Sequence, residues 1–176
     1  NAGTAAVAEA RRQWDVAQKH LTTWIGLDPD NAGAHFRLGN VLFHMGKESE
    51  AIEQFREARK LDAKALQPEL ALARLYDEDG KKDVAKKWIE AAMSSSPQDS
   101  AVLLAAAQWY LGQNDIKTAQ SISEKALSID AKSLEAKIVR GVVARVARDY
   151  ATAEKFFNDA HVQSPGNFPA SNSLAL

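Results

Sequence analysis

Residues 32–65 read AGAHFRLGNVLFHMGKESEAIEQFREARKLDAKA, and their pattern of small and apolar residues recurs along the chain. Short turns follow each helical stretch: Leu27-Asp28-Pro29, Leu61-Asp62-Ala63, Ser95-Ser96-Pro97, Ile129-Asp130-Ala131 and Gln163-Ser164-Pro165. Each turn lies 34 residues after the previous one, without insertion or deletion. A fixed period of this length indicates an array of stacked structural repeats.

The period divides the chain into complete units at 32–65, 66–99, 100–133 and 134–167, with a partial unit at 1–31 and the start of another at 168–176. Repeat positions are counted from the first residue of each unit. Position 8 is always small: Gly39, Ala73, Ala107 and Gly141. Position 20 is always alanine: Ala17, Ala51, Ala85, Ala119 and Ala153. Position 27 is alanine in all complete units: Ala58, Ala92, Ala126 and Ala160. Small residues in fixed register predict points where helix backbones pack closely.

Apolar positions 4, 7, 8 and 11, then 20, 24 and 27, have the spacing of one helix face, so each unit is predicted to be two amphipathic helices. Position 15, between the helices, is Gly46, Gly80 and Asn114, residues that readily adopt the left-handed conformation at a helix end; Arg148 departs from this preference. Position 34 supplies predicted N-caps for the next helix: Asn31, Asp99, Ser133 and Asn167. Ala65 lacks a capping side chain, but Pro68 suits the first turn of a helix.

These residues resemble the tetratricopeptide repeat, whose pattern is Trp-x2-Leu-Gly-x2-Tyr in the first helix, Ala-x3-Phe in the second, and a final Pro. The unit from Ala32 supplies Leu38-Gly39, Leu42, Ala51, Phe55 and Ala58, and the resemblance covers essentially the whole chain. It implies an all-α fold, a right-handed superhelical solenoid of antiparallel helix pairs. Departures are Ala106 and Arg140 in place of Leu at position 7, and Ser123 in place of the aromatic at position 24. A pentatricopeptide array, which binds RNA, is disfavoured because its period is one residue longer and its binding surface is basic.

The composition agrees with an ordinary folded protein. Apolar residues make up 45% of the 176 residues, and the formal net charge of -1 gives no reason to expect nucleic acid or an anionic membrane as a partner. Without cysteine, disulfides and thiol chemistry are excluded. No apolar stretch is long enough to span a membrane. The chain is therefore expected to be soluble, in either the cytoplasm or the periplasm of a bacterium, and to be a fragment of a longer protein because it lacks an initiator Met.

In the family the first helix of each unit lines a concave surface, through positions 2, 5, 9, 12 and 13. The resemblance therefore predicts a peptide-binding groove formed by Phe36, Asn40, Phe43, His44, Leu70, Arg74, Leu104, Gln108, Leu111, Ile138, Val142 and Arg145. Phe36, Leu70, Leu104 and Ile138 share position 5 and are expected to form an apolar ladder open to water, which usually marks a binding surface. The alternative is that curvature of the solenoid packs these residues against their neighbours.

Two better-defined binding modes of the family are not matched. The clamp for a C-terminal carboxylate needs two Asn, two Lys and an Arg; Asn40 is the single match, because Phe36, Ala71, Ala101 and Ala105 occupy the other places. The asparagine ladder of the family's sugar transferase is replaced by Arg37, Ala71, Ala105 and Val139.

No motif for catalysis or for a cofactor is found. The four histidines, His20, His35, His44 and His161, are too scattered to predict a metal site. The tryptophans Trp14, Trp24, Trp88 and Trp109 are interpreted as packing residues rather than stacking platforms. We therefore expect a non-enzymatic scaffold that binds an apolar segment of a partner protein. Two alternatives stay open: a substrate-recruiting array of a larger enzyme, and self-association as a homodimer through an uncapped end.

Overall fold

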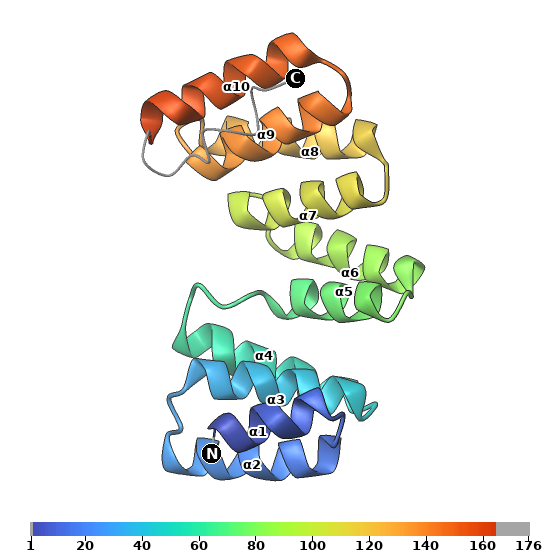
Figure 1. The fold of residues 1–176 in the computed structure, drawn as a ribbon, viewed down its shortest axis with the longest axis vertical. Coiled ribbons are helices and arrows are strands. Elements are labelled where there is room, and N and C mark those ends of the chain that lie inside the picture. Colours follow the sequence, from blue (N-terminus) through green and yellow to red (C-terminus); the bar gives the residue numbers. More distant parts are fainter. Residues whose placement is uncertain (1, 165–176) are drawn as a thin grey trace. The chain divides into compact units, whose positions relative to one another are not determined.

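The structure is a computed structural model that describes residues 2–164, and within this range every regular element is an α-helix (Figure 1). The predicted start of a further unit at 168–176, and the predicted cap Asn167, lie outside the described residues. The first helices of the pairs are α1 (Ala2–Ala10), α3 (Ala32–His44), α5 (Pro68–Glu78), α7 (Ser100–Gly112) and α9 (Leu134–Val146). The second helices are α2 (Trp14–Leu27), α4 (Glu48–Leu61), α6 (Lys82–Ser95), α8 (Ile116–Ile129) and α10 (Tyr150–Gln163).

The helix bounds follow the 34-residue period. All five second helices have 14 residues and begin at the same repeat position. The first helices differ at their starts, since α5 begins at Pro68 and has 11 residues where α3, α7 and α9 have 13. Proline is favoured in the first turn because its missing N–H has no helical acceptor there. The region before Asn31, expected as a partial unit, holds two helices, α1 and α2.

The three predicted caps that lie within the described residues are confirmed. The side chains of Asn31, Asp99 and Ser133 accept hydrogen bonds from backbone N–H groups in the first turns of α3, α7 and α9. Asp115 and Asp149 cap α8 and α10 in the same way. Position 15 is left-handed in every helix pair, with φ of 55° at Arg12, 76° at Gly46, 75° at Gly80, 62° at Asn114 and 63° at Arg148. The preference of the residue type is thus overridden at Arg12 and Arg148 by the helix-to-helix connection.

The chain divides into two compact units, each larger than a single repeat. The first unit is residues 1–89 and the second unit is residues 90–176, with the boundary inside α6. In the first unit α1 packs on α2, α2 on α3 and α3 on α4, while α5 contacts α4. In the second unit α7 packs on α8, α9 packs on both α8 and α10, and α7 also contacts α9. Figure 1 shows the antiparallel pairs α3/α4 and α9/α10 within their respective units.

The alanines at positions 20 and 27 are buried throughout, which confirms them as close helix contacts. Position 8 is equally tight. A Cβ built on Gly39 would come within 2.5 Å of Phe55, and one built on Gly141 within 2.7 Å of Phe157. The core of each unit is therefore built from the residues that the repeat pattern selects.

Candidate functional site

In the first unit, the predicted groove residues of α3 and α5 meet at Phe36. Its ring is half-buried and packs against Phe55, with centroids 5.2 Å apart. The guanidinium carbon of Arg74 lies 5.7 Å from the centroid of the Phe36 ring, within the range of a cation–π contact. Arg74 is exposed, and its Nε lies 3.7 Å from Oε1 of Glu78, which is an ion pair but too long for a hydrogen bond. Most donors of this guanidinium are thus available to a ligand.

Asn40, one turn after Phe36 on α3, has a side-chain oxygen without a hydrogen-bond donor. Its Oδ1 is buried, and no donor among the described residues reaches it. A buried acceptor without a partner costs about 1–3 kcal/mol. Such a group needs a reason to persist, and a binding role is one.

Phe43 and His44 both make contacts with other aromatic rings. Phe43 is buried, with its ring edge-on to Tyr76 at a centroid distance of 4.9 Å. His44 is exposed and stacks on Trp14, with centroids 4.5 Å apart and planes 14° apart. The Tyr76 hydroxyl donates to a carboxylate oxygen of Glu48. This hydrogen bond is the largest cause, and burial the second largest, of the rise in the pKa of Tyr76 to about 12. Phe43 therefore belongs to the core, and His44 supports the ring of Trp14.

In the second unit, the predicted residues lie on α7 and α9, which contact each other directly. Gln108 and Arg145 are exposed, and Leu111, Ile138 and Val142 are half-buried. Val146, at position 13, is 42% exposed. Since α7 carries no charged residue, this face is more apolar than the face of α3 and α5.

The predicted apolar ladder open to water is wrong for two of its four members. Leu70 is 6% exposed and Leu104 is 2% exposed, whereas Phe36 and Ile138 are half-buried. Position 5 borders the packing stripe, so a small rotation of a helix about its axis moves the side chain from the open face into the interior. The alternative interpretation, packing against neighbouring residues, thus holds for Leu70 and Leu104.

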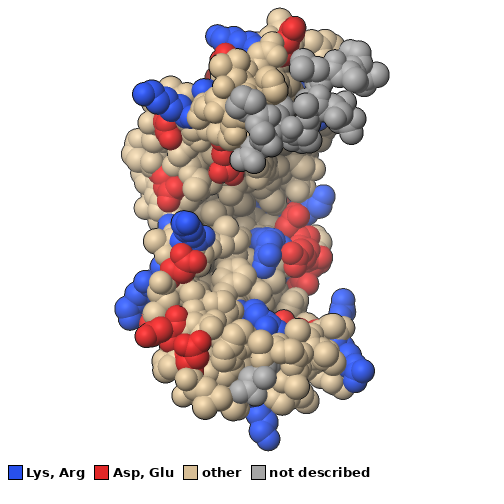
Figure 2. All heavy atoms as spheres, turned by 60° about the vertical axis from the view of Figure 1, so that its left-hand side comes forward, with Lys and Arg blue, Asp and Glu red and all other residues tan. Residues whose placement is uncertain are grey.

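Charge on the surface is mixed. Figure 2 shows one face on which basic and acidic side chains alternate with wide uncharged areas, without a large field of one sign outside the grey residues. One ordered pair is Arg37 with Glu9, at 2.9 Å between Nη2 and Oε1, with the guanidinium also 5.7 Å from the Trp24 ring. Within residues 2–164 no cluster of His, Asp or Glu is placed to hold a metal ion. None of the described helices is long and apolar enough to cross a membrane.

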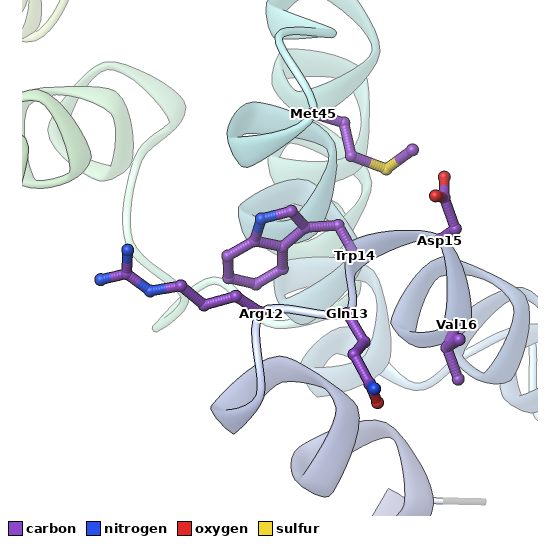
Figure 3. A pocket seen from close by; sticks show the side chains of 6 residues that line it. All are labelled: Arg12, Gln13, Trp14, Asp15, Val16 and Met45. Atoms are coloured by element: carbon purple, nitrogen blue, oxygen red, sulfur yellow. The ribbon is translucent and has the colours of Figure 1, made fainter.

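Sequence reasoning missed a hollow beside Trp14. It is lined by Arg12, Gln13, Trp14, Asp15, Val16 and Met45, from the α1–α2 turn and the end of α3 (Figure 3). The available signal was Trp14 itself: position 17 is Glu48, Lys82 and Ile116 in the next three repeats and is aromatic again at Tyr150.

The paired helices and their regular spacing define the chain as a helical-repeat protein. Comparison with known families identifies which family of repeats it contains. Tetratricopeptide repeat models match residues 4–65 and 70–99, so the chain belongs to the tetratricopeptide repeat family. Repeats of this family are in general protein-interaction scaffolds without catalytic activity of their own. No curated protein matches the sequence.

Solved structures agree on the fold. MamA from Desulfovibrio magneticus RS-1 is 16% identical with a TM-score of 0.57, and the match covers 93% of this chain and 92% of MamA. YrrB, a tetratricopeptide repeat protein with an unusual peptide-binding site, is 16% identical with a TM-score of 0.55, over 93% of this chain and 84% of YrrB. Yeast Tom70 is 18% identical with a TM-score of 0.64, over 85% of this chain and 32% of Tom70.

Proposed function

We propose that the chain is a scaffold that binds an extended segment of a partner protein on the face formed by α3 and α5. The observation that carries the proposal is the Phe36–Arg74 pair, a half-buried ring beneath an exposed guanidinium whose donors are largely unused. An apolar side chain packed beside Phe36 and a carbonyl or carboxylate bound to Arg74 would use both groups. Fully covering a large apolar side chain contributes about 1.5–3 kcal/mol, and Phe36, already half-buried, supplies a part of that.

Asn40 supports binding of the peptide backbone at the same face. Turning its amide by 180° about χ2 would bring the oxygen to the outer side, where a backbone N–H of the ligand can donate to it. The orphan acceptor of the free protein would then be satisfied on binding. The partner segment is therefore proposed to be extended, since a helix keeps its backbone groups for itself.

The face of α7 and α9 is proposed as a second, more apolar contact surface for the partner. Ile138, Val142 and Val146 present apolar area there, and Arg145 and Gln108 provide the polar groups at its border. An exposed valine next to half-buried apolar residues favours this reading.

A library of random peptides displayed on phage and selected against the 176-residue chain tests the proposal. Chemical-shift changes produced by the selected peptides should concentrate on α3 and α5, around Phe36, Asn40 and Arg74. Peptides that shift only residues of the second helices, on the opposite side of each pair, would contradict it. A peptide that binds solely beside Trp14 would also count against this face, although it would support the separate inference below.

Two other roles proposed from the sequence are compatible with the family but require different tests. If the array recruits substrates for a catalytic domain elsewhere in a longer polypeptide, the same face would bind a segment of that substrate. Self-association would appear in light scattering as a molar mass that rises with protein concentration.

A further inference from the structure

The hollow beside Trp14 lies outside the face of α3 and α5 and has a chemistry of its own. Its volume is about 490 Å³, which is ample for one large side chain and part of a backbone. In Figure 3 the Trp14 indole lies between the Arg12 side chain and Met45, while Arg12 and Asp15 stand at opposite ends. The hollow thus combines an apolar centre with one cationic and one anionic end.

The indole at the apolar centre is supported by a stacked ring. Trp14 is the first residue of α2, and its ring is held by the stack against His44 at 4.5 Å. Val16, on the same turn of α2, is 45% exposed, and the Met45 thioether adds a polarisable side wall. An indole already fixed in place loses little conformational entropy when a ligand packs on it.

The cationic end has no counter-ion in the described part of the chain. Arg12 is exposed and takes part in no ion pair there, although its backbone adopts the left-handed conformation with φ of 55°. Asp15 lies in the first turn of α2, where the helix dipole stabilises its carboxylate. Charge complementarity therefore favours a ligand with a carboxylate at the Arg12 end and a hydrogen-bond donor at the Asp15 end.

The same residue types recur in the second unit. Arg148 occupies the left-handed position 15 with φ of 63°, and Tyr150, at position 17, is 66% exposed. Arg12 and Trp14 hold these two positions in the first unit. An arginine followed two residues later by an aromatic side chain is thus found at the same type of turn in both units.

We infer that this hollow docks a segment of a partner protein in which an aromatic side chain precedes an acidic residue. The aromatic ring packs on Trp14 and Met45, the carboxylate pairs with Arg12, and a backbone N–H of the segment donates to Asp15. The inference does not depend on binding at the face of α3 and α5, because the two sites share no residue.

Binding of three short peptides, followed by NMR, tests the inference. The probes are acetyl-Gly-Phe-Glu-Gly-amide, its Gln analogue, and its Ala-for-Phe analogue; the reporter is the indole N–H of Trp14, assigned with the Trp14→Phe variant. Replacing Glu by Gln in the probe should weaken binding about three- to five-fold, the effect of one exposed charge pair. Arg12 is exposed, so the Arg12→Gln variant is expected to melt as the wild type does. In this variant the Glu and Gln probes should bind equally.

The matched control is Arg11→Gln, which removes an exposed arginine of the same turn that does not line the hollow. It should retain the full preference for the Glu probe. The inference would be overturned if the Trp14 indole did not shift at about 5 mM peptide, because the affinity would then be too weak for recognition. Equal binding of the Phe and Ala probes would also overturn it. So would an equal loss of the preference for the Glu probe in both arginine variants, since that would indicate attraction by net charge alone.

Discussion

Gly39 lies against the ring of Phe55 so closely that an added Cβ would stand 2.5 Å from Cε1 of that ring. The same relationship joins Gly141 to Phe157. Position 24 carries the large phenylalanine ring in the two repeats where position 8 is glycine, and a smaller side chain where position 8 is alanine, as in Ala73 with Ile89 and Ala107 with Ser123. The two positions therefore share the space between the helices of a pair, and the residue at position 8 limits the size of the residue at position 24.

Gly39→Ala should destabilise the first unit because the new methyl group has no room beside Phe55. Overpacking of this kind costs about 1–3 kcal/mol, seen as a lower midpoint in urea. Adding Phe55→Ile should recover part of the loss, because it recreates the pair found at Ala73 and Ile89. Gly26→Ala is the control: no atom lies within 4 Å of its added Cβ, so it should stabilise α2 by up to about 1 kcal/mol. Equal effects of the two glycine variants would refute the shared-space account.

Arg148→Gly should stabilise the second unit. A side chain in the left-handed conformation costs about 1–2 kcal/mol that glycine avoids, partly offset by the greater freedom of glycine in the unfolded chain. The reverse change, Gly80→Arg in the first unit, should lower the urea midpoint, because φ there is 75°. A less stable Arg148→Gly protein would mean that the arginine side chain makes a stabilising interaction that outweighs its backbone strain.

Arg140 holds the position that leucine occupies in the family, and it is only 7% exposed. Its Nη2 donates to Glu124 Oε1 at 2.9 Å, and its guanidinium lies 5.8 Å from the Phe156 ring. Arg140→Leu should be neutral or stabilising, since apolar packing replaces the buried guanidinium while the carboxylate of Glu124 stays in contact with water. Glu124→Gln should cost about 0.5–1 kcal/mol, a modest value because Glu124 is 53% exposed. Thermal unfolding of the two variants tests this prediction. A larger loss of stability in Arg140→Leu than in Glu124→Gln would contradict it.

Tyr76 should titrate near pH 12, and Glu48→Gln should bring its pKa back toward 10, because the bond to Glu48 is the largest cause of the shift. The folded-state pKa is above the unfolded value, so the neutral phenol stabilises the fold. That stability is fully present below pH 10 and is lost as the pH rises toward 12. Phenolate absorbance, taken as the difference between the wild type and Tyr76→Phe, measures the transition. A midpoint near 10 in the wild type would rule out the bond to Glu48.

The period of the sequence was sufficient to predict the helix pairs, the caps at Asn31, Asp99 and Ser133, and the buried alanines, because all of these depend on local geometry repeated in register. The exposure of position 5 was not predictable. Leu70 and Phe36 occupy the same repeat position, yet one is buried and the other half-buried, because the outcome depends on how far each helix turns about its axis. The hollow beside Trp14 was missed for a related reason, since its lining comes from the α1–α2 turn, the start of α2 and the end of α3, whose approach no periodic pattern encodes.

The most direct test of partner binding at the face of α3 and α5 compares two charge reversals. Arg74→Glu changes the proposed site, and Arg56→Glu changes an exposed arginine of α4; each wild-type arginine pairs with a glutamate on its own helix, Glu78 and Glu53 respectively. Both variants should therefore fold alike, and calorimetry with a peptide selected against the wild type measures the difference. The account predicts that Arg74→Glu weakens binding at least about ten-fold, as expected for a lost charge-assisted hydrogen bond, while Arg56→Glu leaves the affinity unchanged. Equal affinity of the two variants for that peptide would contradict it.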